Sequence, residues 1–269
     1  MSAVQSYHPD IRVERVDHVT TVTIDRPESK NGCTGEMWVA IGRTFRDIGF
    51  SDARAAVITG AGGNVCTGAE LSGVGASGNG EAAPGPHNMD LMRVLADVVL
   101  SVKDCPIPVV AKVDGLCVGA GFGLALAADL TWCADTARMS TIFAKRGLSL
   151  DFGTSWFLRQ RLPAHKAKEL AFTAKMLSGT EAFELGLVNA VVPADQLDAA
   201  VAEVVDAIAG GPPIALSLTK RQLDNAASSS LAEALEAESL GQSVNVHTED
   251  LREALVAYVE RRPPVFKGR

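Results

Sequence analysis

A glycine-rich turn between a predicted strand and a predicted helix is the first feature of this sequence that could do chemistry. Residues 108–113, Pro-Val-Val-Ala-Lys-Val, are mostly apolar and β-branched, which predicts a buried strand. The turn from Gly115 to Gly121 follows, and small residues and leucines after it favour a closely packed helix. The first amides of a helix have no intrahelical partner and lie at the positive end of its dipole. The turn is therefore a candidate site for an oxygen that gains negative charge.

A second strand runs into a glycine-bearing turn further upstream. Residues 57–63 read Val-Ile-Thr-Gly-Ala-Gly-Gly, and residues 64–71 continue as Asn-Val-Cys-Thr-Gly-Ala-Glu-Leu. Two such turns can each offer one amide to a shared oxyanion, which stabilises a carbonyl as it becomes an enolate or a tetrahedral adduct. The alternative is that the glycines only let a helix lie close to a sheet. The presence of two similar turns favours the oxyanion site.

At these turns the sequence resembles the enoyl-CoA hydratase/isomerase superfamily, which has the crotonase fold. Residues 65–71 are similar to the first oxyanion loop of that family, and Gly115 to Asp129 to the second, in which a glycine triplet opens a helix. Residues 177–193 are similar to the stretch after the active site, and the resemblance extends from about Val13 to Phe266. It implies an α/β, ClpP/crotonase-like fold. A repeated ββα spiral core with the acyl-CoA site would occupy residues 1–193, and a C-terminal helical trimerisation region residues 194–269.

The resemblance also implies which groups bind a coenzyme A thioester. The amides of Ala69 and Ala120 would hold the thioester oxygen, and Ala120 replaces the usual middle glycine, which is tolerable if its φ is negative. Lys30 is a candidate phosphate contact, although a solvated loop lysine is the simpler interpretation. Phe266 and Lys267 are expected to reach coenzyme A of a neighbouring subunit, although packing alone would explain Phe266. The other expected substrate contacts are Cys66, Gly68, Glu70, Leu71, Gly121 and Phe143.

Both acids that hydratases of this family use are missing. Those enzymes position the attacking water with two glutamates, and the corresponding positions fall on Gly123 and Phe143. Neither side chain can orient or deprotonate water. Simple hydration of an enoyl thioester is therefore disfavoured.

One acid remains in the segment that follows, Asp151. It matches the position at which dienoyl-CoA isomerases, ring-opening epoxide isomerases of the phenylacetate type and aryl-CoA dehalogenases carry a working aspartate. A single carboxylate in an apolar pocket can take a proton from one carbon and return it to another. The alternative is that Asp151 caps the helix expected to start near Gly153 or Thr154. We expect Asp151 to be the acid/base group.

Isomerisation of a double bond or ring in a coenzyme A thioester is accordingly the predicted reaction, with no cofactor beyond the substrate's own coenzyme A. Thioester hydrolysis and non-catalytic acyl-CoA binding are the alternatives. A nucleotide-dependent dehydrogenase is rejected, because the later glycine of its turn falls on Asn64 and no tyrosine has a lysine four residues on. The five histidines form no evident metal site or triad, and there is no Gly-x-Ser-x-Gly motif.

Composition sets the wider limits. The 269 residues are 47% hydrophobic and 21% charged, which is typical of a globular protein with a sizeable core. A net charge of −7 without a basic cluster makes nucleic acid an unlikely partner. No signal peptide or membrane-spanning run is recognisable, so we expect a cytoplasmic protein. Five cysteines without metal-ligand spacing predict buried free thiols.

Periodicity predicts the elements that position these groups. Residues 11–16 and 18–24 alternate as a hairpin, Thr34 caps a helix to about Gly49, and residues 130–134 form a strand behind a structural Asp129. Residues 88–103 are helical and by resemblance form a wall of the acyl pocket, whereas residues 72–86 form either a lid or a linker. Helices are expected at 195–209, 213–227, 231–246 and 248–261. The resemblance implies that their apolar stripe lies at the interface of a homotrimer or hexamer, and this stripe comprises Leu231, Leu235, Leu240 and Val244.

Overall fold

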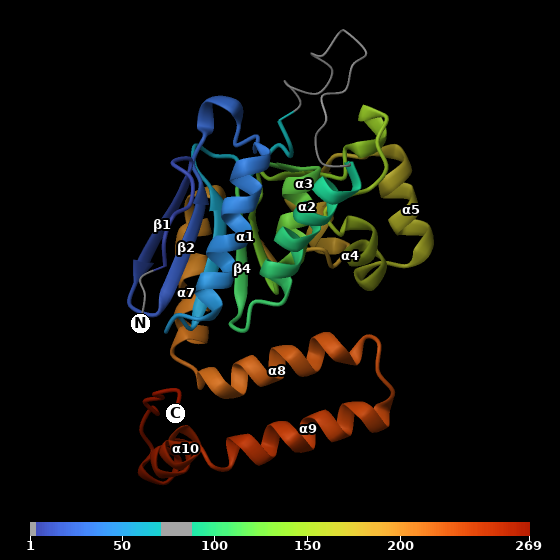
Figure 1. Ribbon diagram of the computed structural model, residues 1–269. Helices are drawn as coiled ribbons and strands as arrows, with labels where there is room; N and C mark the ends of the chain where they lie inside the picture. Colours follow the sequence, from blue (N-terminus) through green and yellow to red (C-terminus); the bar gives the residue numbers. More distant parts are fainter. Residues whose placement is uncertain (1–3, 71–87) are drawn as a thin grey trace.

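A computed structural model describes residues 4–70 and 88–269 (Figure 1). The expected lid or linker at 72–86 and the expected substrate contact Leu71 lie outside the described residues. The elements that carry the remaining expectations are all described.

A six-stranded sheet forms the centre of the fold, in the order β1-β2-β3-β4-β6-β9. The predicted hairpin is confirmed: β1 (Ile11–Val16) pairs antiparallel with β2 (Val19–Ile24), and Val13 lies opposite Val22. Parallel strands continue the sheet from there: β3 (Ala55–Gly60), β4 (Val109–Val113), β6 (Leu130–Ala134) and β9 (Ala190–Val192). The carboxyl ends of β3 and β4 lead into the two glycine-bearing turns.

The segment after β4 is more structured than the single turn expected from its glycines. It contains a short strand, β5 (Leu116–Val118), which joins β7 (Arg138–Ser140) and β8 (Leu177–Ser178) in a second sheet. Gly115 makes the crossing from β4 possible, because its φ is +54° and a Cβ atom there would lie 1.9 Å from the carbonyl oxygen of Gly63. The two glycine-bearing segments are therefore in direct contact.

Three helices line one side of the sheet (Figure 1). In α1 (Gly35–Gly49) the predicted cap is confirmed, since Thr34 Oγ1 accepts a hydrogen bond from the amide of Met37 at 3.3 Å. The predicted helix at 88–103 is confirmed as α2 (Asn88–Lys103). Between the two sheets lies α3 (Ala120–Ala127), and all eight of its residues are buried. A helix that is apolar all round belongs in the core, so the protein holds the N-terminus of α3 rigidly.

Shorter helices follow the second sheet and lead to the C-terminal region. They are the 3₁₀ turns η1 (Pro27–Ser29), η2 (Phe143–Arg146) and η3 (Ala194–Gln196), and the helices α4 (Thr154–Arg161), α5 (Ala164–Thr173) and α6 (Gly179–Glu184).

The helix α7 (Leu197–Ala209) packs on the face of the sheet opposite α1, and Figure 1 shows it behind the strands. Its buried Leu197, Val201 and Val205 form a second core with Val57 and Val110. It therefore completes the core, although it lies beyond the expected boundary at residue 193. The boundary itself stays a prediction.

The last three helices lie apart from the sheet (Figure 1). They are α8 (Pro213–Ala226), α9 (Leu231–Asn245) and α10 (Glu249–Glu260), within two residues of the predicted ranges. Asp129 has the structural role expected of it: its Oδ2 accepts hydrogen bonds from the amide of Val109 and from Lys220 of α8, both at 2.7 Å. In the described part of the chain no single helix is long and apolar enough to cross a membrane, and only residues 194–209 and 213–226, bent by 105°, pass that test as a pair.

Candidate active site

The two glycine-bearing turns lie side by side. The amides of Val65 and Cys66 donate to the carbonyl oxygen of Leu116 at 2.9 and 3.1 Å, and the amide of Val118 donates to Cys66 at 3.0 Å. The chain then turns at Gly68, whose φ is +94°. A Cβ atom on Gly68 would lie 3.5 Å from the amide nitrogen of Ala120, so the glycine lets the first turn approach the start of α3.

The amide of Ala69 is oriented by its neighbours. The amide of Cys33 donates to the carbonyl oxygen of Gly68, and the amide of Glu70 donates to the carbonyl oxygen of Cys33, both at 2.9 Å. Because the Gly68–Ala69 peptide is planar and trans, its N–H points away from the carbonyl oxygen that Cys33 holds. Within residues 4–70 and 88–269 the Ala69 amide has no hydrogen-bond acceptor.

The amide of Ala120 is the second free donor. Ala120 is the first residue of α3, after the cap residue Gly119, and it is not among the residues with positive φ. An alanine is therefore tolerated at this position, which requires a negative φ. Its N–H makes no hydrogen bond to the described residues. It lies at the positive end of the α3 dipole, which suits a negatively charged oxygen.

Gly121 and Gly123 allow two segments to touch α3. A Cβ atom on Gly121 would lie 2.6 Å from the carbonyl oxygen of Cys66, and one on Gly123 would lie 2.6 Å from both the Cβ and the carbonyl oxygen of Phe152. Ala120 and Gly123 share a face of α3, because they are three residues apart. The turn that contains Asp151 and Phe152 therefore packs one helical turn beyond the free Ala120 amide.

Asp151 is half-buried, and one of its carboxylate oxygens is available. Oδ1 accepts a hydrogen bond from the amide of Phe152 at 2.7 Å, whereas Oδ2 has no partner among the described residues. Phe152 has a φ of +50°, unusual for a bulky residue, and its ring packs on Trp38 at a centroid distance of 4.5 Å. The carboxylate thus stabilises a strained turn that is anchored in the core.

The alternative role for Asp151, capping the next helix through its side chain, does not agree with the structure. The cap residue of α4 is Gly153, and no side chain caps this helix. Asp151 contributes only its backbone carbonyl oxygen, which accepts from the amide of Thr154 at 3.1 Å and from its hydroxyl at 2.7 Å.

The two positions expected for hydratase glutamates carry no acid in this structure either. Gly123 has no room for a side chain beside Phe152, and Phe143 is buried in η2. Asp151 is the acid that directly precedes Phe152, the residue that packs against Gly123 of α3.

The remaining expected site residues are distributed more widely. Lys30 is exposed in the loop before α1. Phe266 and Lys267 lie in the C-terminal tail, where Phe266 accepts a hydrogen bond from Arg54 at 3.0 Å. Figure 1 shows this tail at the other end of the molecule from α3, so within one chain these two residues are not brought to the oxyanion turns. Their contacts with coenzyme A stay predictions.

All five cysteines are buried and free, as predicted. Cys33 and Cys66 face each other behind the first turn, with a distance of 3.8 Å between their Sγ atoms. The hydrogen bond from Cys66 and burial raise the pKa of Cys33 well above its usual value. The Cys66 side chain thus packs behind the turn. No group of three or more metal-ligating side chains occurs in the part of the chain that the structure describes.

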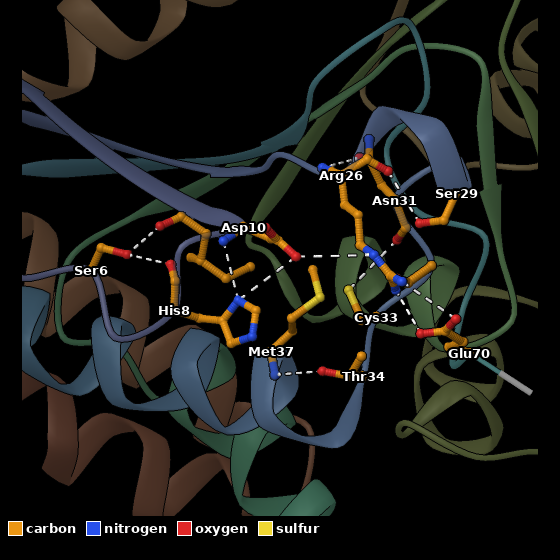
Figure 2. A network of polar contacts seen from close by, with 12 residues as sticks. Ser6, His8, Asp10, Arg26, Ser29, Asn31, Cys33, Thr34, Met37 and Glu70 are labelled. Carbon is orange, nitrogen blue, oxygen red and sulfur yellow. Dashed lines mark hydrogen bonds and ion pairs between the residues drawn. The ribbon is translucent and has the colours of Figure 1, made fainter. Parts of the chain in front are cut away.

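A polar network around Arg26 was not foreseen (Figure 2). Arg26 Nη1 lies 2.6 Å from Glu70 Oε2 and donates to the carbonyl oxygen of Gly32 at 3.1 Å. Asn31 is fully buried, and its side chain bonds the backbone of Arg26, Ala61 and Asn64. The sequence indicates a loop here, because the run from Arg26 to Asn31, with Pro27 in it, interrupts the strand pattern. No spacing rule links residues 26 and 70.

Comparison with known proteins identifies the family. The sequence model of the family described as Enoyl-CoA hydratase/isomerase matches residues 14–269. The chain is 32% identical to a Rhodobacter capsulatus protein named "Probable enoyl-CoA hydratase", over 98% of this chain and all of that one. It is 30% identical to the 1,2-epoxyphenylacetyl-CoA isomerase of Escherichia coli, over 93% and 95% of the two chains. The crystal structure of an enoyl-CoA hydratase from Polaromonas superimposes with a TM-score of 0.89 at 29% identity, covering 96% of this chain and 99% of that one. The chain therefore belongs to the enoyl-CoA hydratase/isomerase family and has its crotonase fold, with a C-terminal helical region.

Proposed function

We propose that the protein isomerises a double bond or a ring in the acyl group of a coenzyme A thioester. The observation that carries this proposal is the set of three groups around the start of α3. The amides of Ala69 and Ala120 lack acceptors among the described residues, and Asp151 has an available carboxylate oxygen one helical turn further on. Two donors and one base are sufficient for an enolate mechanism.

When the substrate carries a double bond that moves, Asp151 takes a proton from one carbon of the acyl group. The electron pair of the broken C–H bond moves through the conjugated system to the thioester oxygen, which becomes an enolate oxygen. The amides of Ala69 and Ala120 hold this oxygen, and one such donor typically contributes about 10²- to 10³-fold in rate. The protonated Asp151 then returns the proton to a different carbon, so that the acid/base group and the carbonyl are both restored.

The lack of an acid at Gly123 and Phe143 favours isomerisation over hydration. Adding water across an enoyl double bond requires groups that orient and deprotonate the water, and neither residue supplies one. The names of the similar proteins include both reactions, and the isomerase from Escherichia coli supports the preference. Thioester hydrolysis with the same oxyanion site is the second candidate, with Asp151 as nucleophile or base at the thioester carbon.

The rest of the substrate is assigned by position. We expect the acyl group to lie near the exposed Met89 and Met92 of α2, because methionine adapts readily to different apolar shapes. Cys66, Gly68, Glu70 and Gly121 belong to the two turns and are proposed substrate contacts, as is Phe143, whose neighbour Ile142 would lie 3.3 Å from a Cβ atom on Gly119. Lys30 is the proposed phosphate contact. The proposal assigns no cofactor besides the coenzyme A of the substrate and places the reaction in the cytoplasm.

The C-terminal helices support a proposed homotrimer or hexamer. Several large apolar side chains of α8–α10 are exposed in a single chain, among them Leu223, Leu231, Leu235, Leu240, Val244, Leu255 and Val259. A surface of this kind is typical of a protein–protein interface. In such an assembly Phe266 and Lys267 would meet the coenzyme A of a neighbouring subunit.

Product analysis in heavy water tests the proposed reaction. Wild type and Asp151→Asn are incubated with enoyl-, dienoyl- and aryl-CoA thioesters, and the products are identified by mass spectrometry. With the wild type we expect an isomerised product that carries deuterium in its acyl group. With Asp151→Asn we expect neither the isomerised product nor the deuterium exchange. Asp195→Asn, at an exposed position in η3, is the control that should retain the activity.

The other products separate the alternatives. Efficient addition of water by the wild type would contradict the preference for isomerisation. Release of the free acid would favour the hydrolase. Thioester binding without any turnover, unchanged in Asp151→Asn, would support a non-catalytic binding protein.

A further inference from the structure

We infer that Arg26 is a positioning residue whose ion pair with Glu70 fixes the Ala69 amide in the oxyanion site. The inference rests on the proposed function, since it assigns a role to a residue that does not touch the reacting atoms. It starts from the position of Glu70, which directly follows Ala69 in the chain. Whatever holds Glu70 limits the motion of the Ala69 peptide.

Glu70 is held through its backbone and its side chain. Its amide donates to the carbonyl oxygen of Cys33 at 2.9 Å. Its carboxylate meets the guanidinium of Arg26, with Nη1–Oε2 at 2.6 Å and Nη2–Oε1 at 3.4 Å. Figure 2 shows the two side chains turned towards each other beside Cys33. Two contacts of an arginine fork restrict rotation as well as distance.

The residue on the other side of Ala69 gives the peptide freedom that must be restrained. Gly68 has a φ of +94°, a conformation that favours glycine, and glycine, which has no Cβ atom, restricts the backbone dihedral angles less than other residues do. The hydrogen bond from Cys33 to the Gly68 carbonyl oxygen orients the Ala69 N–H. That bond survives only while Cys33 and Glu70 stay in register. The Arg26–Glu70 pair is the side-chain contact beside Ala69 to which we assign the maintenance of this register.

The segment that carries Arg26 is itself rigid. We call residues 26–33 the clamp loop. Asn31 in this loop is fully buried, and its Nδ2 donates to Ala61 and Asn64 at 2.8 and 2.6 Å. Thr67 Oγ1 donates to the carbonyl oxygen of Lys30 at 3.2 Å. The clamp loop therefore contacts the first turn at its start, its middle and, through Arg26, its end.

The charge of Arg26 suggests a competing explanation, in which its electric field stabilises the enolate. The two explanations predict opposite effects of removing Glu70 on enolate stability. Arg26 faces Glu70, Glu28 at 3.5 Å and Asp10 at 4.0 Å, and the hydrogen bond to Glu70 raises its pKa, so it stays charged. A cation near the site could stabilise an enolate through its field alone. In that case removing Arg26 would weaken the enolate and removing Glu70 would strengthen it. A positioning role predicts that both removals weaken it.

Bound acetoacetyl-CoA is the probe, because its enolate has an ultraviolet absorption band that the keto form lacks. The apparent pKa of the bound probe is measured from this band in the wild type, Arg26→Met and Glu70→Met. We expect both variants to raise that pKa by about 1 to 2 units, which corresponds to about 10- to 100-fold weaker enolate stabilisation. The double variant Arg26→Glu with Glu70→Arg should recover part of the loss.

Arg12→Met is the matched control. Arg12 also pairs with an acid, Asp25, at 3.1 Å, but it lies on the exposed hairpin. It should leave the pKa of the bound probe unchanged. Thermal unfolding of each variant shows whether it is folded. If a single variant does not fold, the double variant Arg26→Glu with Glu70→Arg still tests the inference.

The outcomes are distinguishable. A wild type that binds the probe without stabilising its enolate would contradict the proposed function, and this inference with it. A stabilised enolate in the wild type that is unchanged in Arg26→Met would overturn the inference alone. Opposite shifts in Arg26→Met and Glu70→Met would assign the effect to the field of the charges and also overturn it.

Discussion

Replacing Ala120 with proline should remove one of the two proposed oxyanion donors and leave the helix in place. Ala120 is the first residue of α3, the position at which proline is favoured because its φ is already suitable and its missing N–H has no intrahelical partner. The preceding residue is Gly119, so no Cβ atom there clashes with the proline ring. Loss of one donor of this kind costs about 2.7–4 kcal/mol in transition-state stabilisation, a fall in kcat of about 10²- to 10³-fold.

The assay is the rate of acyl-group deuterium exchange under saturating thioester, with urea unfolding measured in parallel. Gly35→Pro is the matched control, because Gly35 is the first residue of α1, has open space around it and follows Thr34 in an extended conformation. We expect the control to keep both activity and stability. An Ala120→Pro protein that is folded and exchanges within threefold of wild type would refute the assignment of the Ala120 amide.

Three further changes test the surroundings of the site. Gly123→Ala should lower the free energy of unfolding by about 1–3 kcal/mol and slow deuterium exchange into the acyl group, because the new Cβ would lie 2.6 Å from Phe152. Gly35→Ala is the control, because a Cβ atom there meets no other atom within 4 Å. Equal stability of the two variants would contradict the packing argument. Lys220→Met should lower the free energy of unfolding by about 3–5 kcal/mol in urea titrations, because it leaves the negative charge of the largely buried Asp129 without its ion-pair partner. Adding Asp129→Asn should restore part of the lost stability. A Lys220→Met protein as stable as the wild type would contradict this account. The hydrogen bond from Lys175 lowers the pKa of Glu181 to about 2 from its ordinary 4.5, so the charged carboxylate stabilises the fold above about pH 4.5 and the contribution is lost as the pH falls towards 2. The difference in urea midpoint between wild type and Glu181→Gln should therefore narrow on acidification, and a pH-independent difference would oppose this.

Local patterns in the sequence predict most of the elements. The alternation of residues 11–24, the cap at Thr34 and the apolar spacing of residues 88–103 all appear as predicted, because each pattern reports a local preference or one buried face. The strand β5 was not predicted, since it exists through pairing with β7 and with Cys66. Three residues are too few for a local signal.

The site could be predicted only as far as its residues share a motif. The two turns around Ala69 and Ala120 have recognisable glycines, and the structure places them in contact. The role of Arg26 has no recognisable sequence motif, because its partner Glu70 is 44 residues away and their contact depends on how the clamp loop folds. The structure excludes the side-chain cap considered for Asp151, because Gly153 is the cap residue of α4; the acid/base role of Asp151 stays a prediction.

The most direct test of the oxyanion site is the infrared stretch of the thioester carbonyl of a bound substrate analogue, isolated by carbon-13 labelling. Two amide donors polarise the carbonyl, so we expect a clear shift to lower frequency in the wild type relative to water and a smaller shift in Ala120→Pro. Gly35→Pro should match the wild type. A carbonyl frequency that is the same in Ala120→Pro as in the wild type, with the analogue bound in both, would contradict the account.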